Sequence, residues 1–146
     1  MKVTIIETKD VEETEVKIYC KQRDAQVETL VSSLNVLNQE IIGKKDDANY
    51  VIPLYEIYYF ESVDEKVFCY TDKETFEVKY RLYELEEVLA KARFIRIGIS
   101  MILNVAQVDA FKSSLNGRME ARLKNGESVE ISRSYVPSLR RMLGGQ

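Results

Sequence analysis

Two Asn-Gly dipeptides near the C-terminal end constrain the fold of this chain more than any other feature. Asn116-Gly117 and Asn125-Gly126 separate three short stretches in which apolar and polar residues alternate. Asn-Gly is a strong short-range hairpin signal because both residues accept the positive φ that a tight turn requires. We therefore expect an antiparallel three-stranded meander formed by residues 108–114, 118–124 and 127–132.

The middle stretch of this meander separates apolar from charged side chains. Successive residues of a strand point to opposite faces of the sheet. One face of the strand therefore carries Met119, Ala121 and Leu123, and the other carries Arg118, Glu120, Arg122 and Lys124. The apolar face must be covered by the rest of the protein, so the basic face is left for solvent or for a partner.

The middle of the chain also has the composition of short strands. Residues 57–60, 66–71 and 76–80 are rich in Tyr, Phe and Val, which favour strands. Two short helices are expected, one with apolar positions from Leu82 to Ala92 on one face and one over residues 135–143. Because short strands outnumber helices, the predicted fold class is mainly β with flanking helices, built around an elongated antiparallel domain.

The N-terminal part reads as a short α/β extension. Residues 2–8 and 14–20 are β-rich and predict a hairpin or two short strands. Apolar residues at three- and four-residue spacing predict an amphipathic helix over residues 24–42, ended by Gly43. The polar residues 43–49 are interpreted as a linker. The expected division is an extension of residues 1–45, serving dimerisation or regulation, and a main domain of residues 46–146.

Composition excludes several classes of function. The chain has no histidine, so it cannot use a Ser-His-Asp or Cys-His mechanism, and it lacks the commonest zinc ligand. Cys20 and Cys69 lie far apart and are interpreted as incidental or buried thiols. We expect no metal, no cofactor, no small-molecule substrate and no enzymatic activity. No apolar run approaches the ~20 residues that span a bilayer, and the N-terminus is not a signal peptide, so a cytoplasmic location is expected.

Charge is distributed unevenly along the chain. Residues 1–90 contain 11 Lys and Arg against 20 Asp and Glu, whereas residues 91–146 contain 10 against 4. The formal net charge of −3 therefore hides a basic C-terminal segment. A phosphate backbone responds to the local field of the face that it meets, so this segment could bind nucleic acid or could be an ordinary solvated basic surface.

Three segments, in this order, resemble the LytTR family of bacterial DNA-binding domains. Residues 57–62 are similar to the opening strand of that domain. Phe94-x-Arg96, with Ser100 and the run Met101-Ile102-Leu103-Asn104, is similar to the central segment, and Asn125-Gly126 with Ile131-Ser132-Arg133-x-Tyr135 to the closing one. The resemblance spans about residues 50–143. It implies a transcription regulator that often binds as two copies, with inter-strand loops entering successive major grooves of double-stranded DNA.

The resemblance also implies which residues contact DNA. The family contacts come from the loop after the opening strand, from the residues between Phe-x-Arg and Ser, and from the Ser-Arg pair. On this chain these are the loop from Asp64 to Lys66, the segment from Gly98 to Ser100 with Ile99 at its centre, and Arg133. Arg133 is expected to read a base, and the residues expected to attract phosphates are Lys66, Arg96, Lys112, Arg118 and Arg122. The extension resembles that of small stand-alone members without a receiver domain, some of them regulated by a membrane protein. The expected partners are thus double-stranded DNA, a second copy of the chain and a membrane-protein regulator.

Two departures from the family pattern shift the expected specificity. The family commonly has His-Arg where this chain has Gly98-Ile99, and these side chains cannot hydrogen-bond a base edge, although Ile99 could touch a thymine methyl group. Asp64 and Glu65 beside Lys66 are unfavourable near phosphate. Base reading is therefore expected mainly at the Ser132-Arg133 end.

Several alternatives stay open from the sequence. Arg96 could pair with a glutamate instead of DNA, and Ser100 and Asn104 could hydrogen-bond the local backbone. The whole domain could be a protein-interaction module that has lost specific DNA reading. A carboxylate-based enzyme has no motif behind it.

Overall fold

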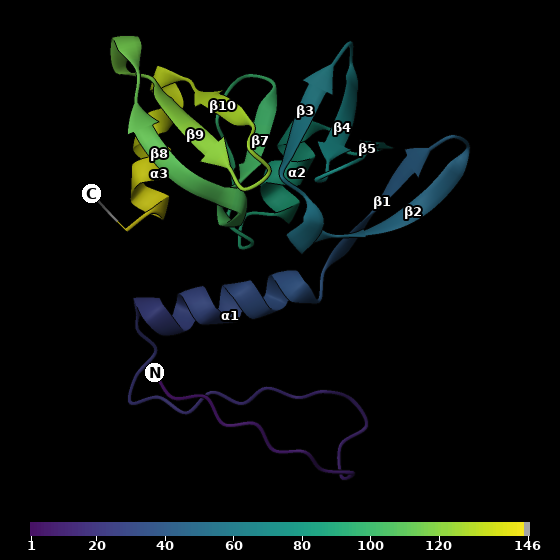
Figure 1. Cartoon of the computed structure of the whole chain (residues 1–146), viewed down its shortest axis with the longest axis vertical. Helices are drawn as coiled ribbons and strands as arrows, with labels where there is room; N and C mark the ends of the chain where they lie inside the picture. Colours follow the sequence, from purple (N-terminus) through teal and green to yellow (C-terminus); the bar gives the residue numbers. More distant parts are fainter. Residues whose placement is uncertain (145–146) are drawn as a thin grey trace.

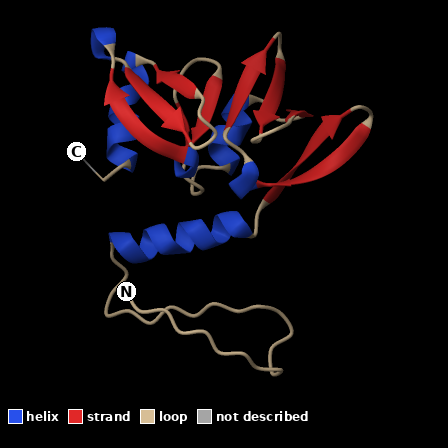
Figure 2. Cartoon of the chain, in the orientation of Figure 1, coloured by secondary structure: helices blue, strands red, loops and turns tan. Residues whose placement is uncertain are grey.

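The computed structural model describes residues 1–144, which form two antiparallel sheets and three α-helices (Figures 1 and 2). The larger sheet has the strand order β2-β1-β5-β4-β3-β7-β6 and the smaller one the order β10-β9-β8. The helices and strands are α1 (Ala25–Leu37), β1 (Glu40–Lys45), β2 (Ala48–Pro53), β3 (Tyr59–Val63), β4 (Lys66–Tyr70), β5 (Thr75–Val78), α2 (Leu82–Val88), β6 (Phe94–Arg96), β7 (Met101–Asn104), β8 (Val108–Ser113), β9 (Met119–Leu123), β10 (Ser128–Ile131) and α3 (Val136–Met142). Short 3-10 turns are η1 (Leu54–Glu56), η2 (Val105–Gln107), η3 (Leu115–Gly117) and η4 (Arg133–Tyr135).

The smaller sheet is the predicted meander. β8, β9 and β10 pair in sequence, and Asn116 and Gly117 adopt φ values of 60° and 76° in the connection between β8 and β9. Met119, Ala121 and Leu123 of β9 are buried, as the alternation predicts. On the other face, Arg118, Arg122 and Lys124 are exposed and Glu120 is partly exposed. The mainly β fold class with flanking helices is confirmed.

Two hydrophobic cores lie on opposite faces of the larger sheet. Adjacent residues of β3 show the division, because Phe60 belongs to the first core and Tyr59 to the second. The first core joins the larger sheet to α2, with Leu82, Leu85 and Leu89 of the helix region packed in it. The second core joins the larger sheet to the meander and α3. β3 and β7 are therefore packed against a core on each face of the sheet. Close packing on both faces restricts the positions of the loops at their ends.

Asn104 is the one buried polar side chain among the described residues. Its amide nitrogen donates to the Ile57 carbonyl at 2.8 Å, and its amide oxygen accepts from the Ala106 backbone N–H at 3.1 Å. The prediction that Asn104 hydrogen-bonds the local backbone is confirmed for Ala106, whereas the bond to Ile57 reaches a distant part of the chain. Burial of a polar amide is tolerated here because both ends are hydrogen-bonded.

The predicted N-terminal hairpin is wrong. Residues 2–8 and 14–20 are extended but belong to no strand, and their side chains are almost all exposed. We call residues 1–24 the arm. Figure 1 shows the arm on the far side of α1 from the two sheets. Its β-favouring residues meet no apolar surface of this chain, which explains why local propensity alone does not produce a sheet here.

The predicted helix over residues 24–42 is too long, and the predicted linker over 43–49 is wrong. α1 ends at Leu37, and Ile41 and Gly43 lie in β1. β1 and β2 form a hairpin whose turn, Asp46-Asp47, has φ values of 51° and 65°. A Cβ on Gly43 would lie 2.5 Å from Ile52 Cδ1, so this glycine serves close strand packing instead of ending a helix. The boundary expected between residues 45 and 46 falls inside this hairpin turn.

Candidate nucleic-acid interface

The three loop segments singled out in the sequence lie next to one another. The Ser62 N–H, just before the β3–β4 turn, donates to the Ser100 carbonyl at 2.8 Å. The Ser132 N–H, just after β10, donates to the Ile97 carbonyl at 2.9 Å. The β6–β7 loop is thus hydrogen-bonded to both of the other segments. We call the β3–β4 turn, residues 97–100 and residues 132–134 the loop face.

The loop face and the arm lie at opposite ends of the molecule. In Figure 1 the β3–β4 turn and η3 are at the upper end, while α1 and the arm are at the lower end. Both sheets stand between them. A partner bound at the loop face therefore leaves the arm free.

Arg96 organises the middle loop of this face. Its Nε donates to the Gly98 carbonyl at 2.8 Å, and its other guanidinium nitrogens contact the Ile99 carbonyl and the Glu86 carboxylate. The side chain is only 20% exposed. The guanidinium thus joins α2 to the backbone of the β6–β7 loop, which is the local pairing that the sequence left open.

Ile99 and Ser100 occupy the tip of that loop. Ile99 is 85% exposed, and Ser100 is exposed as well. Since Arg96 holds two carbonyls of the loop, Ile99 projects from a supported backbone. Its apolar side chain can make van der Waals contact with a methyl group but offers no hydrogen bond.

Arg133 is the exposed cation at the other end of the loop face. It begins η4, directly after the Ser132 contact, and it lines a shallow depression together with Asn116, Arg118 and Glu130. A Cβ at position 117 would lie 2.9 Å from Arg133 Cδ, so the stem of the arginine passes against Gly117. Within residues 1–144 its guanidinium has no hydrogen-bond or ion-pair partner. It is therefore available to an anionic or hydrogen-bonding ligand.

Comparison with known proteins agrees with this geometry. Residues 47–144 match the family described as the LytTr DNA-binding domain. This chain belongs to the LytTr DNA-binding domain family. The matched region includes the whole loop face and omits the arm and α1.

The similar proteins include regulators related in sequence and a DNA-binding domain of known structure. An uncharacterized HTH-type transcriptional regulator of Staphylococcus aureus strain COL is 26% identical over 145 residues, covering 98% of each chain. Another from strain MW2 is 27% identical over 133 residues, covering 90% of each. The solved LytTr DNA-binding domain from Bacillus cereus is 31% identical with a TM-score of 0.68, covering 72% of this chain and 96% of that one.

The other predicted phosphate ligands of this LytTr domain are more dispersed. Lys66 follows the β3–β4 turn and is exposed. Arg118 lines the same depression as Arg133, but its Nη1 forms an ion pair with Glu130 Oε1 at 3.3 Å. Lys112 Nζ likewise lies 3.9 Å from Glu120 Oε2. Arg122 lies on the outer face of the meander, and no acidic partner is found for it within residues 1–144. The structure therefore groups Arg118 with Arg133 and places Lys112 and Arg122 along the meander.

Two contributors to the LytTr loop face were missed from the sequence. Ser62 supplies the N–H that fastens the middle loop, and Gly117 supplies the surface against which Arg133 packs. The Asn116-Gly117 dipeptide predicts a turn, and the structure adds that Gly117 also makes room for the Arg133 side chain. The long-range contacts between Gly117 and Arg133 and between Ser62 and Ser100 have no local sequence pattern.

The aromatic residues of β3 and β4 do not form an exposed stacking platform. Tyr59 and Tyr70 stack with ring centroids 4.5 Å apart and belong to the second core or pack against it. Burial and a hydrogen bond from its hydroxyl to Glu127, 3.0 Å long, raise the pKa of Tyr59. Burial also raises the pKa of the Cys69 thiol to about 12. These groups are neutral core elements.

Two further kinds of feature were sought in the described part of the chain. Residues 1–144 contain no cluster of three or more His, Cys, Asp or Glu side chains arranged to hold a metal ion. No helix among them is long and apolar enough to cross a membrane.

Proposed function

We propose that this LytTr protein regulates transcription by binding double-stranded DNA through the loop face, with Arg133 as the principal base reader in the major groove. The family match and the regulators among its relatives support DNA-binding transcription regulation. The contribution of individual residues is our inference from the geometry.

The arrangement of Arg133 carries this assignment. Its guanidinium is unpaired within the described chain, its stem rests on Gly117, and the residue before it is hydrogen-bonded to Ile97. An arginine held by its stem loses less side-chain freedom on binding. A free guanidinium fork can contact guanine O6 and N7 together, which is the commonest specific contact in the major groove.

The remaining residues take supporting roles. Ile99 contacts a thymine methyl group, and Ser100 contacts the adjacent backbone or base. Lys66, Lys112, Arg118 and Arg122 attract phosphates, which contributes affinity without sequence preference. Arg96, held by its three contacts, contributes mainly by shaping the loop that presents Ile99.

The test compares Arg133→Ala with Arg122→Ala. Selection from random duplexes defines the preferred site, and fluorescence anisotropy then measures affinity for that site and for single-base variants over a range of salt. Arg133→Ala should cost about 1–3 kcal/mol on the preferred site and lose discrimination at one base position. Arg122→Ala should weaken all sequences alike and reduce the salt slope by about one unit.

Two outcomes contradict the proposal. An Arg133→Ala protein with unchanged affinity and unchanged preference excludes Arg133 as the reader. Wild-type binding that stays undetectable as salt is lowered would instead support the protein-interaction module. The homodimer, the membrane-protein regulator, the cytoplasmic location and the division at residue 45 stay predictions.

A further inference from the structure

The depression beside Arg133 contains a carboxylate as well as two guanidinium groups. Glu130 lines it together with Arg118 and Arg133, and 56% of the Glu130 side chain is exposed to solvent. A carboxylate repels the phosphates of DNA. At a DNA-binding surface it therefore lowers affinity unless it has a partner on the DNA.

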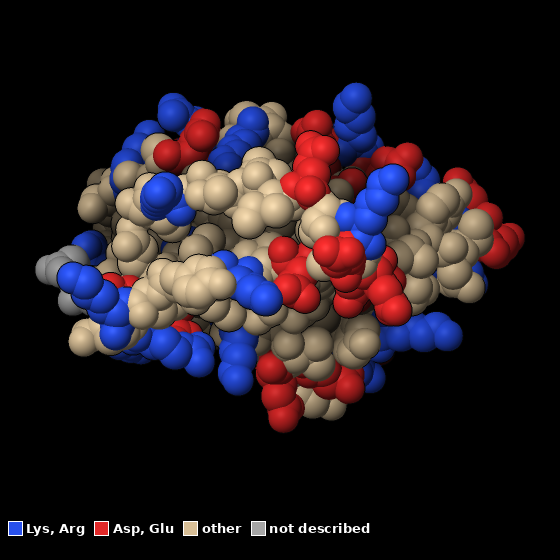
Figure 3. Space-filling model, turned by 90° about the horizontal axis from the view of Figure 1, so that it is seen from below, with Lys and Arg blue, Asp and Glu red and all other residues tan. Residues whose placement is uncertain are grey.

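Acidic side chains at the other end of the molecule have no such conflict. Figure 3 views the molecule from the end that carries α1 and the arm, and it shows groups of Asp and Glu side chains beside Lys and Arg. That end faces away from the loop face, so its carboxylates lie away from DNA bound there. Glu130, by contrast, lies three residues before Arg133, the proposed base reader.

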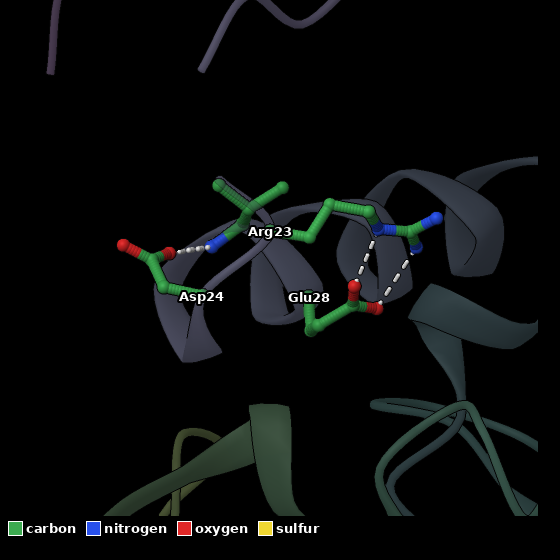
Figure 4. A network of polar contacts seen from close by, with 4 residues as sticks. Arg23, Asp24 and Glu28 are labelled. Atoms are coloured by element: carbon green, nitrogen blue, oxygen red, sulfur yellow. Dashed lines mark hydrogen bonds and ion pairs between the residues drawn. The ribbon is translucent and has the colours of Figure 1, made fainter. Parts of the chain in front are cut away.

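The ion pair with Arg118 does not account for the carboxylate of Glu130. Glu130 Oε1 lies 3.3 Å from one Arg118 nitrogen, both side chains are about half exposed, and no hydrogen bond within the described chain holds the carboxylate. Figure 4 shows a stronger arrangement, in which Arg23 donates two hydrogen bonds of 2.7 and 3.1 Å to Glu28. An exposed pair with a single contact contributes little to stability. The Glu130 carboxylate is therefore free to take a partner on a ligand.

Strand pairing directs Glu130 to the outer face of the meander. Glu130 of β10 lies directly opposite Glu120 of β9, and Glu120 lies opposite Lys112 of β8. The residues on either side of Glu130, Val129 and Ile131, are buried in the second core. Because successive residues of a strand point to opposite faces, the Glu130 carboxylate is held at the surface that forms the depression.

The four bases differ in whether they offer a carboxylate a partner in the major groove. An ionised carboxylate can only accept hydrogen bonds. Cytosine presents its N4 amino donor there, whereas guanine and thymine present acceptors, and adenine presents the acceptor N7 beside its amino group. A carboxylate therefore favours cytosine over the other three bases.

We propose that Glu130 is a specificity-determining residue at the edge of the loop face: its carboxylate accepts a hydrogen bond from N4 of a cytosine, in the base pair that Arg133 reads or in the adjacent one. This inference rests on the proposed function of the loop face. Both side chains line one depression, and adjacent base pairs are about 3.4 Å apart, so the two contacts fall within one dinucleotide step. Arg118 contacts Glu130 through one nitrogen, which leaves its other N–H groups for a phosphate.

The first test measures base preference with the full chain. Fluorescence anisotropy compares the preferred duplex, found by selection, with duplexes that carry each other base at every position. The wild type should prefer cytosine by about tenfold at one position, in or next to the base pair at which Arg133→Ala loses discrimination. Glu130→Ala should reduce this preference to less than about twofold. It should also raise affinity for duplexes without that cytosine, because a repulsion of phosphate is removed.

Glu120→Ala is the matched control. Glu120 is the cross-strand neighbour of Glu130 and also lies beside a cation, 3.9 Å from Lys112, but it does not line the depression. Its substitution removes the same charge from the same face of the meander. Glu120→Ala should raise affinity for all duplexes alike and keep the cytosine preference.

The second test changes the DNA and leaves the protein intact. N4-methylcytosine still pairs with guanine, but its methyl group replaces the amino hydrogen that points into the major groove. With this base at the identified position, the wild type should lose about tenfold in affinity, whereas Glu130→Ala should lose less than about twofold. N4-methylcytosine outside the bound site should affect neither protein.

The outcomes separate this inference from the function on which it rests. Wild-type binding that stays undetectable as salt is lowered overturns both. If Arg133→Ala loses discrimination but Glu130→Ala keeps every base preference, only the role of Glu130 is overturned. Equal losses for the wild type and Glu130→Ala with N4-methylcytosine, or a preferred site without cytosine at these positions, also overturn it. Circular dichroism confirms that Glu130→Ala is folded.

Discussion

The arm and the loop face each expose an isoleucine to the same extent, yet the backbone that carries the isoleucine is supported by hydrogen bonds in only one of the two regions. Ile5 and Ile99 are both 85% exposed. The backbone around Ile99 is held by Arg96 and by hydrogen bonds to Ser62 and Ser132. The backbone around Ile5 has no such support within the described chain. The difference teaches that equal exposure can sit on very different backbones: the loop around Ile99 is held by contacts within the described chain, whereas no such contact holds the backbone around Ile5.

The largest expected contrast is between a core and an arm substitution. Phe60→Ala removes a fully buried ring of the first core and should lower the free energy of unfolding by about 3–5 kcal/mol. Ile5→Ala should change it by less than about 0.5 kcal/mol, since the side chain is 85% exposed. Urea unfolding of the two variants and the wild type checks both. A loss of similar size for Ile5→Ala would mean that the arm belongs to the folded unit of one chain.

A smaller contrast is expected between two asparagines. Asn104→Ala leaves the Ile57 carbonyl and the Ala106 N–H without their side-chain partner inside the protein, which should cost about 2–3 kcal/mol. Asn35→Ala, on the exposed surface of α1, is the control and should stay within about 0.5 kcal/mol of the wild type. The same urea experiment measures both. Equal costs would show that the buried amide does not hold η2 against the segment between η1 and β3.

The smallest expected effect concerns alkaline pH. The folded pKa of Tyr59 lies above its ordinary value, so the neutral hydroxyl stabilises the protein below about pH 10, and this contribution is lost as pH rises from there towards the folded pKa. Tyr59→Phe should cost about 1 kcal/mol at pH 7 through the lost Glu127 bond. Above pH 10 it should also make the free energy of unfolding less dependent on pH.

The control for this experiment is Tyr19→Phe, because Tyr19 lies in the arm and is 91% exposed. Unfolding curves from pH 7 to about pH 11 should be the same for this variant and the wild type. If the free energy of unfolding of Tyr59→Phe depends on pH as that of the wild type does, the loss of stability at alkaline pH arises elsewhere in the protein.

Local patterns predicted the parts of the fold that depend on neighbouring residues. Alternation in β9 correctly assigned Met119, Ala121 and Leu123 to a buried face, and Asn116-Gly117 correctly located a turn. The same kind of pattern failed at Gly43, where the spacing of the apolar residues predicted a helix end. Only the approach of Ile52 and Phe76 decides that this glycine lies in a strand.

In the loop face, too, local patterns located the segments, whereas tertiary contacts decided the state of each side chain. The motif match selected Arg96 and Arg133 together, because both are spaced correctly along the chain. In the fold, Arg96 is occupied by Glu86 and two loop carbonyls, while Arg133 remains free beside Gly117. The sequence left open whether Arg96 pairs with a glutamate or with DNA, because the glutamate that occupies it comes from α2, a separate element.

By itself, the sequence determined the antiparallel meander, the family and the three segments that form the loop face. These follow from side-chain alternation, turn chemistry and motif order, all of which are local. The tertiary structure alone decided which arginine is free, which glycine packs inside a sheet and which β-favouring segment lacks a partner. Each of these depends on atoms brought together from distant parts of the chain, because hydrogen bonding and burial are satisfied only where the folded chain provides a partner.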